Sequence, residues 1–190
     1  MSTFKIVILA LALVFSSWPA YIHAGIRLAK EPLFRRINYS GIMLSVQFLL
    51  AGAGLYIGTK TGSFDQKVNM TISLVLILII GLSVFLTGIK LPSEQGESPD
   101  QADTKVIFLS ALVEGIASLA IGLAIGLLSA NLFLHWIVIG VFYLIGIVSA
   151  ITLASIFGNR SLRFKVAPIG GFLFLAASLK LILTLTGYGF

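Results

Sequence analysis

The stretch LSALVEGIASLAIGLAIGLLSANLF, residues 109–133, decides the class of fold, because it is long and apolar enough to lie in lipid. A hydrocarbon core about 30 Å thick needs roughly 20 apolar residues for each helical span. This segment carries a single acidic residue, Glu114. A carboxylate is costly at such a depth, so the segment raises the question of what the residue does there.

Apolar runs of the same kind recur along the whole chain. Of its 190 residues, 58% are hydrophobic and only 11% are charged, and the mean hydropathy of +1.06 is too high for an ordinary soluble domain. The alternating ten-residue segments of an outer-membrane barrel are absent, so backbone hydrogen bonds must close within helices. The sequence therefore predicts an all-α integral membrane protein with six transmembrane helices, at about 4–24, 38–58, 68–90, 105–128, 132–157 and 165–187.

The basic residues gather in the short connections between these runs. Because cytoplasmic connections are enriched in Lys and Arg, the first, third and fifth connections are predicted to be cytoplasmic and both termini outside. The expected location is the cell membrane, as in a bacterial inner membrane. The net charge of +6 then reflects topology, and no nucleic-acid partner is expected. Cysteine is absent, which excludes disulfides and thiolate metal sites.

The two halves of the chain are similar to each other. FKIVILALALVF (4–15) parallels TKVIFLSALVEG (104–115) at an offset of one hundred, and Gly81 aligns with Gly171 at an offset of ninety. Each half has three spans, an odd number, so the second half enters the membrane in the opposite direction. The sequence thus predicts two inverted-topology three-helix repeats that place the first and fourth spans against each other. Their ranges are 1–90 and 105–190, joined by an acidic cytoplasmic linker at 91–104.

Two further stretches carry a resemblance to a known family. The run SLAIGLAIGLLSANLFLHWIVIGVFYLIGIVSAITLASIFGNR (118–160) and the closing IGGFLFLAASLKLIL (169–183) resemble the putative manganese efflux pump (MntP-like) family of LysE-type exporters. The resemblance implies a membrane exporter of a manganese-like divalent cation. Members carry an aspartate in helices one and four, in a motif of the form S-x-D-A-x-A-V. In this chain Ala117 stands at the helix-four position, and Ser17 or Pro19 stands at the helix-one position.

Glu114 is the main candidate site residue, and a candidate metal ligand. It lies one turn before Ala117, and the same helix face continues through Ser118, Gly122 and Gly126. Small residues at this spacing let another helix approach closely, so Glu114 is expected to face protein. There it would coordinate a cation or carry a proton that drives exchange. The alternative is a protonated glutamate that only makes a hydrogen bond between helices.

Ser118 on the same face is also a candidate for the ion pathway, as are three residues elsewhere. Gln47 shares a helix face with small residues and offers an amide oxygen, unless it only bonds two helices together. Ser17 precedes Pro19, which exposes backbone carbonyls in the preceding turn, although a plain kink would have the same sequence. Asn131 lies in a short turn. It would act there either as a gate contact or as a cap of the turn.

These observations favour a membrane transporter that exports a small cation or small solute. In one version of this hypothesis, export is coupled to protons. The alternative is a non-transporting assembly or signalling protein on a transporter-derived scaffold. No catalytic constellation such as HExxH or G-x-S-x-G is present, so no enzyme activity and no cofactor are expected. The expected partners are the lipid bilayer and the small cation or solute, and assembly into a homo-oligomer is left open.

Overall fold

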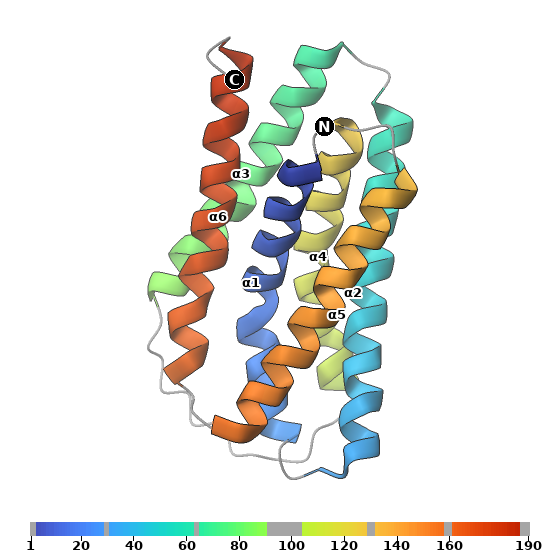
Figure 1. The fold of residues 1–190 in the computed structure, drawn as a ribbon, viewed down its shortest axis with the longest axis vertical. Coiled ribbons are helices and arrows are strands. Elements are labelled where there is room, and N and C mark those ends of the chain that lie inside the picture. Colours follow the sequence, from blue (N-terminus) through green and yellow to red (C-terminus); the bar gives the residue numbers. More distant parts are fainter. Residues whose placement is uncertain are drawn as a thin grey trace.

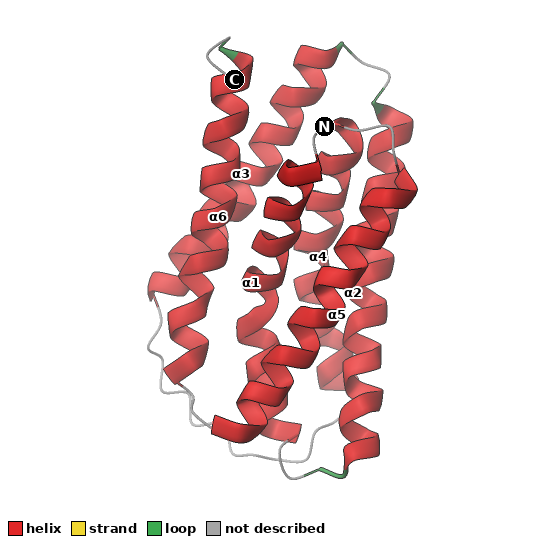
Figure 2. Ribbon diagram, in the orientation of Figure 1, coloured by secondary structure: helices red, strands yellow, loops and turns green. Residues whose placement is uncertain are grey.

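The apolar runs form α-helices, in which every backbone N–H and C=O finds a partner inside the same segment. The computed structural model describes residues 3–28, 31–62, 65–90, 104–128, 132–157 and 161–186. All regular structure in these residues is helical (Figure 2), as the sequence predicts. The helices are α1 (Thr3–Leu28), α2 (Leu33–Thr61), α3 (Gln66–Lys90), α4 (Thr104–Leu128), α5 (Leu132–Phe157) and α6 (Ser161–Leu185). The predicted linker at 91–104 lies outside the described residues except for Thr104.

The helix α2 begins at Leu33, more than one turn before the predicted start. Pro32 precedes its first turn with an extended backbone, and its carbonyl accepts the N–H groups of Arg35 and Arg36 at 3.0 and 3.2 Å. Proline lacks an N–H donor, so it fits a helix start, where that donor would have no partner. Arg35 and Arg36 are therefore part of the helix, although their charge suggested that they lie in the connection between the first two helices.

Four helices are long and apolar enough to cross a membrane over their described residues. They are α2, α3, α4 and α5, whereas α1 and α6 contain shorter apolar stretches at Val7–Trp18 and Ile169–Lys180. Large hydrophobic side chains are exposed on α2 to α6, but none of those described on α1 is. Contiguous apolar surface of this kind marks a region that contacts lipid or another protein.

The helix α1 lies at the centre of the bundle. It packs against α4, α5 and α6, while α2 pairs with α4 and α3 pairs with α6. Figure 1 shows α3 and α6 together on one side of α1, and α2 and α5 on the other. Buried residues follow one another around α1, from Leu9 and Ala10 to Leu13 and Val14. This helix is therefore buried on most sides because the other helices surround it.

Glycines allow α2 and α4 to pack with their backbones in contact. A Cβ on Gly54 would overlap the Leu119 carbonyl, and one on Gly122 would overlap the Ala51 carbonyl. Gly58 and Gly126 lie against each other in the same way. Gly54, Gly58, Gly122 and Gly126 form the glycine seam. Its α4 half is the predicted stripe of small residues, and its partner is α2.

Trp18 links α1 to α5. Its indole N–H donates to the Gly146 carbonyl at 3.1 Å, and a Cβ on Gly146 would overlap the side chain of Val14. Here too a glycine lets two helices approach, but the side chains that meet are apolar.

Candidate functional site

Three fully buried polar side chains meet where α2, α4 and α5 pack together. Ser118 donates a hydrogen bond to the side-chain oxygen of Gln47, and its hydroxyl oxygen lies 2.5 Å from that of Tyr143. Since the Ser118 proton is directed to Gln47, Tyr143 is the donor to Ser118. Gln47 in turn donates to the Ala111 carbonyl at 3.4 Å. Gln47, Ser118 and Tyr143 form the Ser118 cluster.

The glycine seam explains why this cluster forms. Gln47 lies one turn before Ala51 on α2, and Ser118 lies one turn before Gly122 on α4. Because Gly122 brings α4 onto the backbone at Ala51, the preceding turns of both helices are also held close. A hydroxyl and an amide can then bond directly across the helix interface.

Glu114 places a carboxyl group at the edge of the cluster. It is partly buried one turn before Ser118, and it interacts electrostatically with Tyr143 of α5 and Tyr21 of α1. Its carboxylate therefore acts on the side of α4 that faces α1 and α5. A carboxylate inside an apolar bundle is costly unless it is paired, hydrated or protonated.

The helix α1 contributes two buried hydroxyl groups from neighbouring turns. Ser17 and Tyr21 are almost fully buried, each with 1% of its surface exposed. The two side chains interact, but the Tyr21 hydroxyl makes no hydrogen bond of ordinary geometry. Tyr21 lies within electrostatic reach of Tyr143 and Glu114, so α1 faces the cluster at this level.

Four of the five residues predicted for the ion pathway lie in this region of the structure. Glu114, Ser118 and Gln47 lie together, and Ser17 is linked to them through Tyr21. Asn131 and the side chain of Pro19 lie outside the described residues. The predicted packing of the first span on the fourth is seen in the contact between α1 and α4.

Sequence reasoning missed Tyr21 and Tyr143. Tyrosines in an apolar segment count toward its hydrophobicity, and they are commonly placed at the membrane interface. The available signal was their spacing, since Tyr21 lies one turn after the candidate Ser17 on α1.

The cluster presents only oxygen ligands. These are two hydroxyls and one amide oxygen, with the Glu114 carboxylate beside them and the Tyr21 hydroxyl opposite. Oxygen ligands suit hard cations such as Mg²⁺, Ca²⁺ and Mn²⁺ better than soft ones. No group of three or more His, Cys, Asp or Glu that could hold a metal occurs among the described residues, so any cation here would depend on neutral oxygens.

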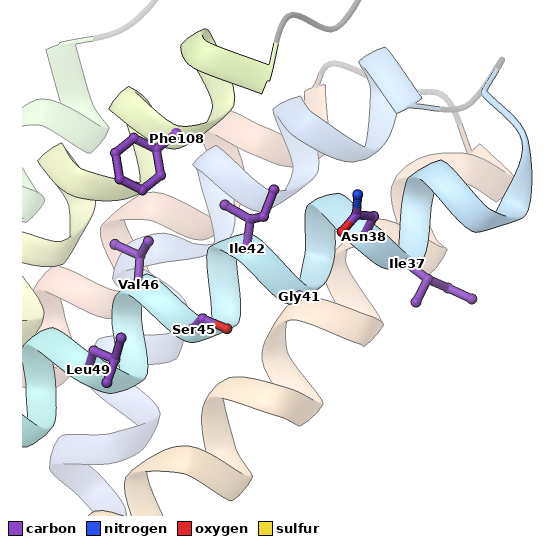
Figure 3. Close-up of a pocket in the computed structure, with 8 residues that line it drawn as sticks. All are labelled: Ile37, Asn38, Gly41, Ile42, Ser45, Val46, Leu49 and Phe108. Carbon is purple, nitrogen blue, oxygen red and sulfur yellow. The ribbon is translucent and has the colours of Figure 1, made fainter.

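An apolar groove lies on the outer surface and differs in character from the cluster. It runs along α2 beside Phe108 of α4, and Figure 3 shows that every other lining residue comes from α2. Ile37 and Leu49 at its ends are 62% and 64% exposed. None of the residues that line the groove belongs to the Ser118 cluster.

Comparison with known proteins decides the family. Residues 32–182 match the family described as "Putative manganese efflux pump". The chain belongs to this family. A relative from Syntrophobacter fumaroxidans, named putative manganese efflux pump MntP, is 27% identical over 188 residues, covering 96% of this chain and 100% of the relative.

Other members of the efflux pump family also match this chain over most of its length. One from Ruminiclostridium cellulolyticum is 24% identical over 182 residues, with 95% of both chains covered, and carries the same name. One from Pseudomonas aeruginosa is 23% identical over 160 residues, covering 84% of this chain and 82% of the relative. No solved structure matches this chain. Family membership and the apolar helices together identify a multi-pass membrane protein of a transporter family.

Proposed function

We propose that this protein exports a small divalent cation of the manganese class, and that the cation passes the Ser118 cluster. The observation that carries the proposal is the buried set of oxygen ligands beside Glu114, at the level where α1, α2, α4 and α5 meet. The relatives are named as manganese efflux pumps, which supports this choice of cargo.

The chemistry of the cluster is compatible with transient binding. A hard divalent cation usually gathers six or more oxygen ligands at a tight site, often with several carboxylates. One carboxylate with neutral hydroxyls and an amide would bind more weakly, and a transporter needs a site that also releases its cargo. The same carboxylate would carry a proton on the return step, which gives a proton-coupled exchange.

The chain departs from the family pattern at two positions. Ala117 on α4, and Ser17 or Pro19 on α1, stand where the resemblance implies aspartates, so neither position supplies a carboxylate. Glu114 lies one turn before Ala117, displaced along α4 by about 4.5 Å at 1.5 Å per residue. It would supply the carboxylate that Ala117 lacks.

Inverted repeats are part of the proposal, and the helix contacts support them. When α1, α2 and α3 are exchanged with α4, α5 and α6, the pairing of α2 with α4 becomes that of α5 with α1, which also occurs. The contact between α1 and α6 likewise becomes that between α4 and α3. Gly81 lies against Phe174, and Gly171 lies against Phe85. Such halves have two nearly equivalent packings, which suits alternating access.

The repeats require all six helices to cross the membrane, including α1, which the other helices surround, and α6, which exposes apolar side chains such as Phe172. In Figure 1 the start of α1 and the end of α6 lie toward the same end of the bundle. The Arg-rich start of α2 argues for a cytoplasmic connection between α1 and α2, and so for termini outside the cell membrane.

The test is Mn²⁺ uptake into everted membrane vesicles, with Glu114→Gln as the variant and Glu31→Gln as the matched control. Glu31 pairs with Arg35 at 3.0 Å at the start of α2, away from the cluster. We expect Glu114→Gln to lower the uptake rate by about tenfold or more, because the site loses its negative charge. The control should keep the parent rate, and collapse of the proton gradient should abolish uptake.

Two results would contradict the proposal. Full Mn²⁺ uptake by Glu114→Gln would place the cation elsewhere. A parent protein that moves no divalent cation in these vesicles would favour the scaffold hypothesis, in which the fold is retained without transport.

A further inference from the structure

The hydroxyl of Tyr21 is buried without a hydrogen-bond partner. The side chain is 1% exposed, and its oxygen makes no hydrogen bond of ordinary distance and angle, although the Ser17 side chain lies near it. Folding normally satisfies such a group, because an unpaired buried hydroxyl loses its bonds to water without replacement. An exception at this place calls for an explanation, such as a ligand that completes the bonding.

The surroundings of Tyr21 indicate what would complete it. Its hydroxyl interacts with the Ser17 side chain and lies within electrostatic reach of Glu114 and Tyr143. Tyr21 packs in the buried cluster that includes Ala111 of α4 and Ile147 of α5, so it lies between α1 and the two helices that carry Glu114 and Tyr143. A cation bound at this point would be attracted to the carboxylate. The phenol oxygen would donate a lone pair to it.

Tyr143 provides the contrast. Its hydroxyl is fully buried as well, but it is bonded to Ser118 at 2.5 Å. Two tyrosines therefore flank the same carboxylate, one with its bonding satisfied by the protein and one without. A polar cluster that only holds the helices together would have no need of a second buried tyrosine whose hydroxyl bonding is incomplete.

We propose that the Tyr21 oxygen is a ligand for the transported cation, so that the loaded site spans from α4 to the central helix α1. This assignment rests on the proposed function. It adds a neutral oxygen from α1 to a site that holds one carboxylate among the described residues, and it makes the position of α1 depend on whether the site is loaded.

The test uses the purified full chain in detergent, with free Mn²⁺ measured by its electron paramagnetic resonance signal and stability measured by thermal unfolding. Tyr21→Phe is the variant, and Tyr56→Phe, whose side chain is 56% exposed, is the control. We expect Tyr21→Phe to raise the apparent Kd for Mn²⁺ by about tenfold, the size expected for one lost ligand bond. Without metal it should be as stable as the parent or more so, because only an unpaired hydroxyl is removed.

The comparison with Tyr143→Phe separates a ligand from a structural group. Removing the Tyr143 hydroxyl breaks its bond to Ser118, so this variant should lower Tm without metal. If Tyr21→Phe also lowers Tm and leaves the Kd for Mn²⁺ unchanged, Tyr21 bonds a buried water and the assignment is wrong. If Mn²⁺ binds the parent and is lost in Glu114→Gln but kept in Tyr21→Phe, the export proposal stands and the Tyr21 assignment fails. If the parent binds no Mn²⁺, both fail.

Discussion

At the scale of single residues, hydroxyl and amide groups bond across the helices of this protein. Ser118 serves two partners at once, the Gln47 amide and the Tyr143 hydroxyl. Polar residues in apolar spans stand out in a sequence, so Gln47, Ser118 and Glu114 could be found without a structure. Their mutual bonds could not, because they depend on how far two helices approach.

Ser118→Ala should destabilise the protein more than an ordinary hydroxyl deletion. It leaves two buried groups without their partner, and each such group costs about 1–3 kcal/mol. Thr71→Ala is the control, since the exposed Thr71 hydroxyl bonds the Lys67 carbonyl of its own helix. Thermal unfolding in detergent should show a clear loss of Tm for Ser118→Ala and little change for the control. Equal Tm values would mean that the cluster contributes nothing to stability.

At the scale of helices, glycine determines which pairs pack closely. The glycines of α2 and α4 were recognised as stripes of small residues, but a stripe does not name its partner. That α2 meets α4, rather than its neighbour α1 or α3, follows from complementary surfaces over the whole crossing. The helix ends were predicted to within a few residues, and α2 deviates because Pro32 starts the helix before its charged turn.

Alanine substitutions should separate the seam from the outer surface. A Cβ on Gly54 would strike the Leu119 carbonyl, a backbone atom that cannot move without shifting α4. A Cβ on Gly41 would meet nothing within 4 Å. We expect Gly54→Ala to reduce folded yield and Tm, whereas Gly41→Ala should be neutral or stabilising by up to about 1 kcal/mol, because alanine favours helix. Similar losses for both variants would contradict the close packing of α2 on α4.

At the scale of the whole molecule, the number of helices and their membrane class could be predicted from hydropathy alone. The central position of α1 could not, because hydropathy does not tell which helix the others surround. Only the contacts distinguish a helix surrounded by others from one that faces lipid.

Single-cysteine labelling should determine the orientation, since the natural chain has no cysteine. Thr61→Cys places a thiol at the end of α2, and Pro32→Cys places one at its start, both at exposed positions. With the first connection cytoplasmic, a membrane-impermeant maleimide should label Thr61→Cys in intact cells and Pro32→Cys only after permeabilisation. The opposite pattern would invert the topology and would turn the proposed exporter toward uptake.

The bond from Trp18 to Gly146 has a consequence for stoichiometry. At the hundred-residue offset between the halves, Trp18 corresponds to Ser118, Val14 to Glu114 and Ile147 to Gln47. The place related to the Ser118 cluster is thus filled by apolar side chains, and the described residues hold one such cluster where a symmetric duplication would hold two. Under the proposed function, each turnover would therefore carry a single divalent ion, and the electrical charge moved per cycle would be that of one ion less any counter-transported protons.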